Sequence, residues 1–236
     1  RVSPVYQRNK MRTLTGIVCS TVIGTALFAT TAKAVVLQDL LDGATLTVGD
    51  KIFSDWSYVT ICGPDATAIT VNGFTHNELL HGIGIYGEFS AVGDVCSAAI
   101  SYKVTALSPQ WIERIGLSYT LSASGNGGTI EIGETVWKDG FGLGVPVGQA
   151  SVSFSDMSDP PPEPILQGDD LTWAPSYLEA VYVTKTISLA AADAGSAVGA
   201  DAIYQNFYQV PEPAHTALAL LAVSALGGIV IRRRRG

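Results

Sequence analysis

Apolar and polar residues alternate with a period of two through much of the chain. In "AISYKVTAL" (99–107) every second residue from Ile100 is apolar, and in "RIGLSYTLS" (114–122) the same holds from Ile115. Successive side chains of a strand point to opposite faces of a sheet, so this pattern predicts strands with one buried and one wet face.

Weaker strand patterns recur between Gly, Pro, Asn and Asp residues, which are typical of turns. They cover 44–48, 51–59, 67–72, 82–90, 128–137, 150–154 and 180–189. No long amphipathic helix interrupts them, and 189–202 has helix-forming residues with enough glycines to be a loop instead. The pattern therefore predicts an all-β fold: one antiparallel β-sandwich, jelly-roll-like, over residues 35–209.

The first 34 residues have the layout of a leader with a secretory signal peptide. A basic start around Arg12 precedes an apolar stretch from Leu14 to Ala29, and Ala32-Lys33-Ala34 supplies a small-x-small cleavage site. This arrangement is typical of export. The alternative is a buried N-terminal helix.

The last 27 residues, 210–236, combine a short polar motif, an apolar run and a basic cluster. Residues 214–231 carry no formal charge, and as a helix they would extend about 27 Å, close to the hydrocarbon core of a bilayer. Arg232, Arg233, Arg234 and Arg235 follow directly, and clustered arginines favour the cytoplasmic side. We therefore expect a C-terminal transmembrane helix with the body outside the cytoplasm. A buried C-terminal helix is disfavoured because four consecutive arginines would be hard to pair.

Val210-Pro211-Glu212-Pro213, followed by the apolar run and the arginines, resembles the PEP-CTERM sorting signal of Gram-negative bacteria. The resemblance implies that Val210, Pro211, Glu212 and Pro213 are a sorting motif recognised by an exosortase, a membrane transpeptidase. It also implies a chain anchored in the inner membrane before processing, and then found at the cell surface or in the extracellular matrix or biofilm. The prolines would keep this motif extended.

The body is similar to an uncharacterised group of PEP-CTERM proteins. The similar segments are "ATLTVGDKIFSDWSY" (44–58), "AAISYKVTAL" (98–107), "IEIGETVW" (130–137) and "QNFYQVPEP" (205–213). This similarity brings no catalytic residues with it.

Charge is distributed unevenly along the chain. Between residues 35 and 213 there are five basic residues against all 21 acidic ones, a net charge of −16. Such a surface repels nucleic acids and anionic headgroups. We therefore expect no nucleic-acid partner.

Cys62 and Cys96 are the only cysteines outside the leader. In an exported chain such a pair usually forms a disulfide. Two separate buried thiols are the alternative.

Candidate chemical sites are weak. "HNELLH" (76–81) lacks the spacing of a zinc helix motif and is interpreted as loop. A cysteine with His81 could form a nucleophile and base, Asp50, Asp55, Glu88, Glu131 and Glu134 could supply paired carboxylates, and "GDD" (168–170) or "LLDG" (40–43) could offer oxygen ligands to calcium. No local pattern supports any of these, so we expect no catalytic residue, cofactor or metal.

Three functional hypotheses remain. The first is a non-enzymatic surface or matrix protein processed by exosortase. The second is a carbohydrate-binding module that attaches to exopolysaccharide, with Trp56, Trp111, Trp137 or Trp173 stacking on sugar rings. The third is a secreted hydrolase.

Overall fold

The computed structural model describes residues 34–77, 80–108, 110–124, 127–154, 168–172 and 177–211. Its elements in chain order are β1 (Val35–Val36), α1 (Leu37–Leu41), β2 (Leu46–Val48), β3 (Lys51–Thr60), the short 3-10 helix η1 (Ala66–Ala68), β4 (Thr70–Asn77), β5 (Leu80–Val92), β6 (Val95–Ala106), β7 (Gln110–Ser124), β8 (Gly128–Trp137), β9 (Gly148–Phe154), β10 (Gly168–Thr172), β11 (Ala180–Ala191) and β12 (Ala197–Pro211).

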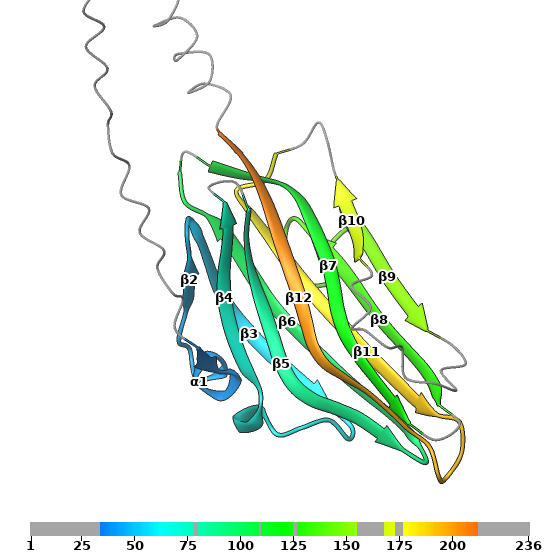
Figure 1. Ribbon diagram of the computed structural model, residues 1–236. Coiled ribbons are helices and arrows are strands. Elements are labelled where there is room, and N and C mark those ends of the chain that lie inside the picture. The colour runs from blue at the N-terminus through cyan, green and yellow to red at the C-terminus, as the bar shows by residue number, and fades with distance from the viewer. Residues whose placement is uncertain are drawn as a thin grey trace, which may run out of the picture. The chain divides into compact units, whose positions relative to one another are not determined.

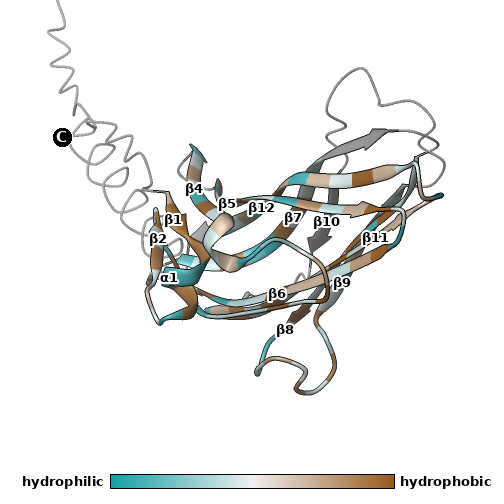
Figure 2. Cartoon of the chain, turned by 90° about the horizontal axis from the view of Figure 1, so that it is seen from below, coloured by the Kyte–Doolittle hydropathy of each residue, from teal (hydrophilic) through white to brown (hydrophobic). Residues whose placement is uncertain are grey.

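The strands form two antiparallel sheets that pack face to face (Figures 1 and 2). Sheet A has the order β1-β4-β5-β12-β7-β10, and sheet B has the order β2-β3-β6-β11-β8-β9. The prediction of an all-β antiparallel sandwich is confirmed. Consecutive strands repeatedly change sheet, and β11 and β12, adjacent in the chain, lie near the centres of opposite sheets.

Apolar residues from the inner faces of both sheets make one continuous core. The ring centroids of Phe53 in sheet B and Phe207 in sheet A lie 5.4 Å apart in an edge-to-face contact. Trp56 stacks on Tyr102 at 4.6 Å. Trp56 and Tyr102 both belong to sheet B, so of these two contacts the Phe53–Phe207 pair is the one that joins the layers.

A bulge in β3 aims Trp56 into this core. The pairing of β3 with β6 shifts between Ser54 and Ser57, and Asp55 at the bulge has a φ of 54°. Aspartate tolerates this left-handed conformation better than most residues. The extra residue reverses the strand's alternation, and Trp56 is only 7% exposed.

Two local predictions were wrong. Of residues 189–202, expected as helix or loop, 189–191 end β11 and 197–202 begin β12, which pairs with β5 and β7 along its length. "HNELLH" is not a loop throughout, because His76 lies in the last part of β4 and His81 lies in β5, paired with Thr75. In both cases pairing to neighbouring strands outweighs the local preference of the sequence.

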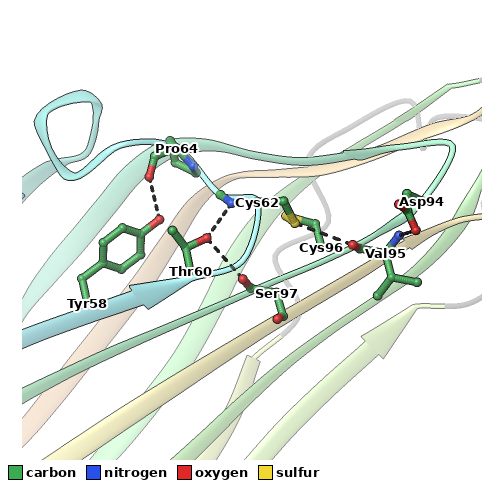
Figure 3. The surroundings of a disulfide bond; sticks show 9 residues. Tyr58, Thr60, Cys62, Pro64, Asp94, Val95, Cys96 and Ser97 are labelled. Atoms are coloured by element: carbon green, nitrogen blue, oxygen red, sulfur yellow. Dashed lines mark hydrogen bonds between the residues drawn. A yellow bond between two sulfur atoms is a disulfide. The ribbon is translucent and has the colours of Figure 1, made fainter.

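A disulfide joins Cys62 and Cys96, with the two Cα atoms 5.3 Å apart. It connects the segment after β3 to the start of β6 (Figure 3). Beside it, the Tyr58 hydroxyl donates to the Pro64 carbonyl at 2.7 Å, so the turn that carries Cys62 is also held by a hydrogen bond.

Several predictions concern residues outside the described ranges. The signal peptide (1–34, apart from Ala34), the apolar run 214–231, Glu212, Pro213 and the four terminal arginines all belong here. Among the described residues, no helix has the length and apolar composition needed to cross a bilayer.

Candidate functional site: an aromatic face on sheet A

The outer side of sheet A carries a group of partly exposed aromatic side chains. We call this group the aromatic face. It consists of the rings of Phe74 on β4, Tyr86 on β5, and Tyr204 and Tyr208 on β12, together with the Arg114 side chain on β7, which lies over the Tyr208 ring. Strand register places them on one side, because Tyr204 pairs with Gly84 and Tyr208 with Arg114, while the intervening Phe207 points into the core.

Glycines under the rings let them lie close to the sheet. A Cβ added at Gly82 would lie 2.4 Å from the ring of Phe74, and one added at Gly84 would lie 2.7 Å from the ring of Tyr86. Both rings therefore cover backbone that has no side chain of its own. The result is an apolar surface on the solvent side of the sheet.

Edge-to-face contacts fix the rings relative to one another. Tyr204 lies between Tyr86, at a centroid distance of 5.8 Å, and Phe74, at 6.4 Å. Because Tyr204 and Tyr208 are four residues apart on one strand, their Cα atoms are separated by roughly 13 Å. The face thus extends across β4, β5, β12 and β7, and along β12 from Tyr204 to Tyr208.

Polar groups lie among the rings. The Arg114 guanidinium lies 3.6 Å from the centroid of the Tyr208 ring, a cation–π contact at the edge of the face. Asn72 pairs with Gly84, and Asn206 pairs with both Gly82 and Gly116. The Oδ1 atom of Asn72 is buried without a hydrogen-bond partner.

The hydroxyl of Tyr86 stays protonated at physiological pH. Burial raises the pKa of Tyr86 to about 12, and the hydrogen bond and electrostatic interaction with Tyr204 add smaller contributions in the same direction. Tyr86 therefore presents a neutral hydroxyl, which can donate and accept hydrogen bonds, beside its apolar ring.

Two of the tryptophans expected to form a sugar platform, Trp56 and Trp137, lie outside this face. Trp56 is part of the core, and Trp111 makes an edge-to-face contact with Tyr177 at 6.3 Å. Trp137 pairs with Tyr182 in sheet B, and Trp173 lies outside the described residues. The sequence signal for the actual face was a set of aromatics in the polar phase of strands, at Phe74, Tyr86 and Tyr204.

The candidate acids do not converge either. Glu134 is buried and pairs with Lys185, while Asp50 binds Lys51 at 2.7 Å. Glu88 and Glu131 are exposed, and Asp55 occupies the β3 bulge. "GDD" (168–170) lies in β10, and "LLDG" (40–43) contains the end of α1. Within the described residues, no three His, Cys, Asp or Glu side chains come close enough to hold a metal ion.

Two residues of the predicted sorting motif belong to the sandwich. Val210 pairs with Trp111 and Pro211 pairs with Gln110 at the end of β12. Just before them, Gln209 accepts a hydrogen bond from Lys51, which also binds Asp50. Burial lowers the pKa of Lys51, and the hydrogen bond and charge of Asp50 oppose that shift. This buried polar cluster fixes the end of the last strand where the motif begins.

No family model matches the chain, and no curated protein matches it. Among solved structures, a family 61 carbohydrate-binding module in complex with β-1,4-galactotriose has a TM-score of 0.32 and 13% identity, covering 67% of this chain and 90% of that one. A family 4 carbohydrate-binding module has a TM-score of 0.28 and 13% identity, with coverages of 66% and 94%. A family 11 module from Clostridium thermocellum with a β-1,3-1,4-mixed-linked tetrasaccharide has a TM-score of 0.26 and 9% identity, with coverages of 66% and 90%. At these scores the similarity assigns the chain to none of these families.

Proposed function

We propose that this protein is a non-catalytic glycan-binding module whose ligand lies on the aromatic face. The observation that carries the proposal is the placement of Phe74, Tyr86 and Tyr204 on the solvent side of sheet A, in mutual contact and over glycines. Partly exposed aromatic clusters of this kind mark binding surfaces on soluble proteins.

The chemistry of the face suits a sugar. A pyranose ring presents an apolar C–H face and a rim of hydroxyls, so it requires a flat apolar surface bordered by hydrogen-bonding groups. Phe74 and Tyr204 supply the surface. Asn206 and Arg114 border that surface, and the side-chain amide of Asn206 can both donate and accept hydrogen bonds.

Charge favours a neutral glycan over an acidic one. The body carries a net charge of −16 between residues 35 and 213, and this would repel a polyanion. The one basic side chain of the face, Arg114, lies against the ring of Tyr208. We therefore infer that the ligand is an uncharged exopolysaccharide.

We further propose that the module works outside the inner membrane, as a jelly-roll-like sandwich sorted by exosortase. The support is the sequence itself: the signal-peptide layout, the Val210–Pro213 motif and the arginine cluster agree on one topology. A surface protein that binds exopolysaccharide would contribute to a matrix or biofilm. The hypothesis of an exosortase-processed surface protein and that of a carbohydrate-binding module are therefore compatible.

Tyr204→Ala is expected to weaken glycan binding by at least about tenfold, or about 1.4 kcal/mol, because Tyr204 is the central ring of the face. Binding is measured by titration against neutral polysaccharides chosen from a glycan array. Tyr204→Phe keeps the ring and should retain most of the affinity.

Tyr182→Ala is the matched control for this experiment. Tyr182 lies in sheet B, where its ring contacts Phe141 and Lys103, so its removal should leave the affinity unchanged. Thermal melts of all variants report whether each remains folded. Equal losses in the Tyr182 and Tyr204 variants, or an array with no bound neutral glycan, would contradict the proposal.

Tail processing is expected to remove residues 214–236 in the native host. Mass spectrometry of the protein from cells with and without exosortase measures this directly. We expect the intact tail only in cells that lack the enzyme, because the motif would then go unrecognised. Recovery of the full Arg232–Arg235 cluster from wild-type cells would overturn the sorting proposal without affecting the glycan site.

A further inference from the structure

Three polar side chains meet in the core between the two sheets. Lys185 on β11 and Glu134 on β8 are register partners in sheet B, and Gln205 on β12 reaches them from sheet A. The Lys185 Nζ atom lies 2.5 Å from Glu134 Oε2. Gln205 Nε2 donates to the other carboxylate oxygen, Oε1, at 3.4 Å, and to the Gly116 carbonyl at 3.1 Å.

The group is enclosed by protein. Lys185 and Gln205 are 0% exposed, and Glu134 is 2% exposed. The Oε1 atom of Gln205 is buried without a hydrogen-bond partner, and so is the hydroxyl of Tyr102. An ion pair in such surroundings loses its hydration without a full set of replacement partners, which makes the charged form costly.

We propose that Lys185 and Gln205 become joined by an intramolecular isopeptide bond, with Glu134 as the proton carrier. The arrangement that supports this is the bridging carboxylate. One oxygen of Glu134 contacts the amine that would attack, and the other contacts the amide nitrogen that would leave.

The reaction balances with the groups present. Glu134 takes a proton from the Lys185 ammonium, and the neutral amine attacks the side-chain carbonyl carbon of Gln205. The new C–N bond forms with a second proton passing from Lys185 to the departing nitrogen through Glu134, and the original C–N bond breaks to release ammonia. Glu134 ends as a neutral carboxylic acid, and no oxidant, metal or cofactor is needed.

The surroundings favour this reaction. Burial lowers the pKa of Lys185, although the charge and hydrogen bond of Glu134 oppose that shift, so the nucleophilic neutral amine becomes more accessible. The product replaces a buried cation and a buried anion with two neutral groups, which removes the cost of burying charge. Tyr102, within the electrostatic influence of Glu134, is an uncommitted hydroxyl donor in the same region.

The bond would tie β11 of sheet B to β12 of sheet A. Because β12 is the strand that leads into the sorting motif, the cross-link would fasten the C-terminal attachment to the opposite layer of the sandwich. A surface protein pulled through its C-terminus would then resist separation of its two sheets.

Tryptic mapping of the denatured and reduced full-length protein tests the proposal. Lys185 is the only lysine or arginine between Lys138 and Arg232. An unlinked chain is therefore cut after Lys185, whereas the linked chain gives one peptide from Asp139 that runs through Lys185 uncut. That peptide should be lighter than its sequence by one ammonia, with fragment ions that join Lys185 to Gln205.

Two variants test the assigned roles. Gln205→Met removes the acyl group and should abolish the linked peptide, while Glu134→Gln keeps the shape and should slow its formation by roughly a hundredfold or more. The wild-type digest decides the matter even if a variant fails to fold. Complete cleavage after Lys185 overturns the proposal, as does loss of water with a link to Glu134. An undiminished link in the Glu134→Gln variant overturns the role of Glu134.

Discussion

Lys185→Met is expected to lower the free energy of unfolding by about 3–5 kcal/mol relative to wild-type protein in which Lys185 is not linked to Gln205, because it leaves Glu134 buried without its cationic partner. The methionine fills a similar volume, so little of the effect should come from a cavity. Urea denaturation at neutral pH measures the change.

The double variant Lys185→Met/Glu134→Leu is the control. With both charges gone, no group is left without a partner in this pair, and the double variant should be more stable than Lys185→Met alone. A double variant as unstable as the single one would mean that packing, not charge, causes the loss.

Cys62→Ser/Cys96→Ser is expected to cost roughly 3–4 kcal/mol of stability. The bridge closes a loop with a sequence separation of 34, and without it the unfolded chain regains the corresponding freedom. Equilibrium denaturation of the double variant and of wild type, each with and without a reductant, measures this cost.

The reduced wild type serves as the comparison for the disulfide. It should unfold at nearly the same denaturant concentration as the double variant, which does not respond to the reductant. Wild type that unfolds identically with and without reductant would contradict the prediction. Cys96 pairs with Leu189 on β11, the strand that also carries Lys185. The loss of stability from removing the disulfide therefore need not add simply to that of Lys185→Met.

The sandwich was predictable because its strands alternate strongly. β6 and β7 have an apolar residue at nearly every second position, and burial on one face makes that period unavoidable. β12 was missed because Gly199, Ala200 and Asp201 interrupt the same pattern, and the register shifts there. The alternation of Ile203, Gln205 and Phe207 with Tyr204 and Asn206 was present in the sequence but followed this interruption.

The buried charges had a sequence signal of their own. Lys185 occupies the apolar phase of β11, between Val183 and Ile187, and Glu134 occupies the same phase in β8, between Ile132 and Val136. Alternation alone therefore indicates that both point inward. Their meeting was not predictable, because the register between β8 and β11 depends on the packing of the whole sheet.

The sequence indicates that aromatic side chains point to solvent from several strands, but it does not indicate that they lie together. Phe74, Tyr86 and Tyr204 stand in the solvent-facing phase of three strands separated by up to 130 residues. Only the order β4-β5-β12 brings them together. Tryptophan was the obvious candidate for stacking on sugar, but Trp56 is turned inward by a bulge that no local pattern announces.

The most direct test of the glycan-binding account is a backbone-amide NMR titration of isotope-labelled protein with a neutral polysaccharide fragment. The account predicts that shifts concentrate on β4, β5, β12 and β7 around Gly82, Gly84, Asn206 and Gly116, beneath and beside the rings. Shifts confined to the outer side of sheet B, or no saturable shifts with any neutral fragment, would contradict it.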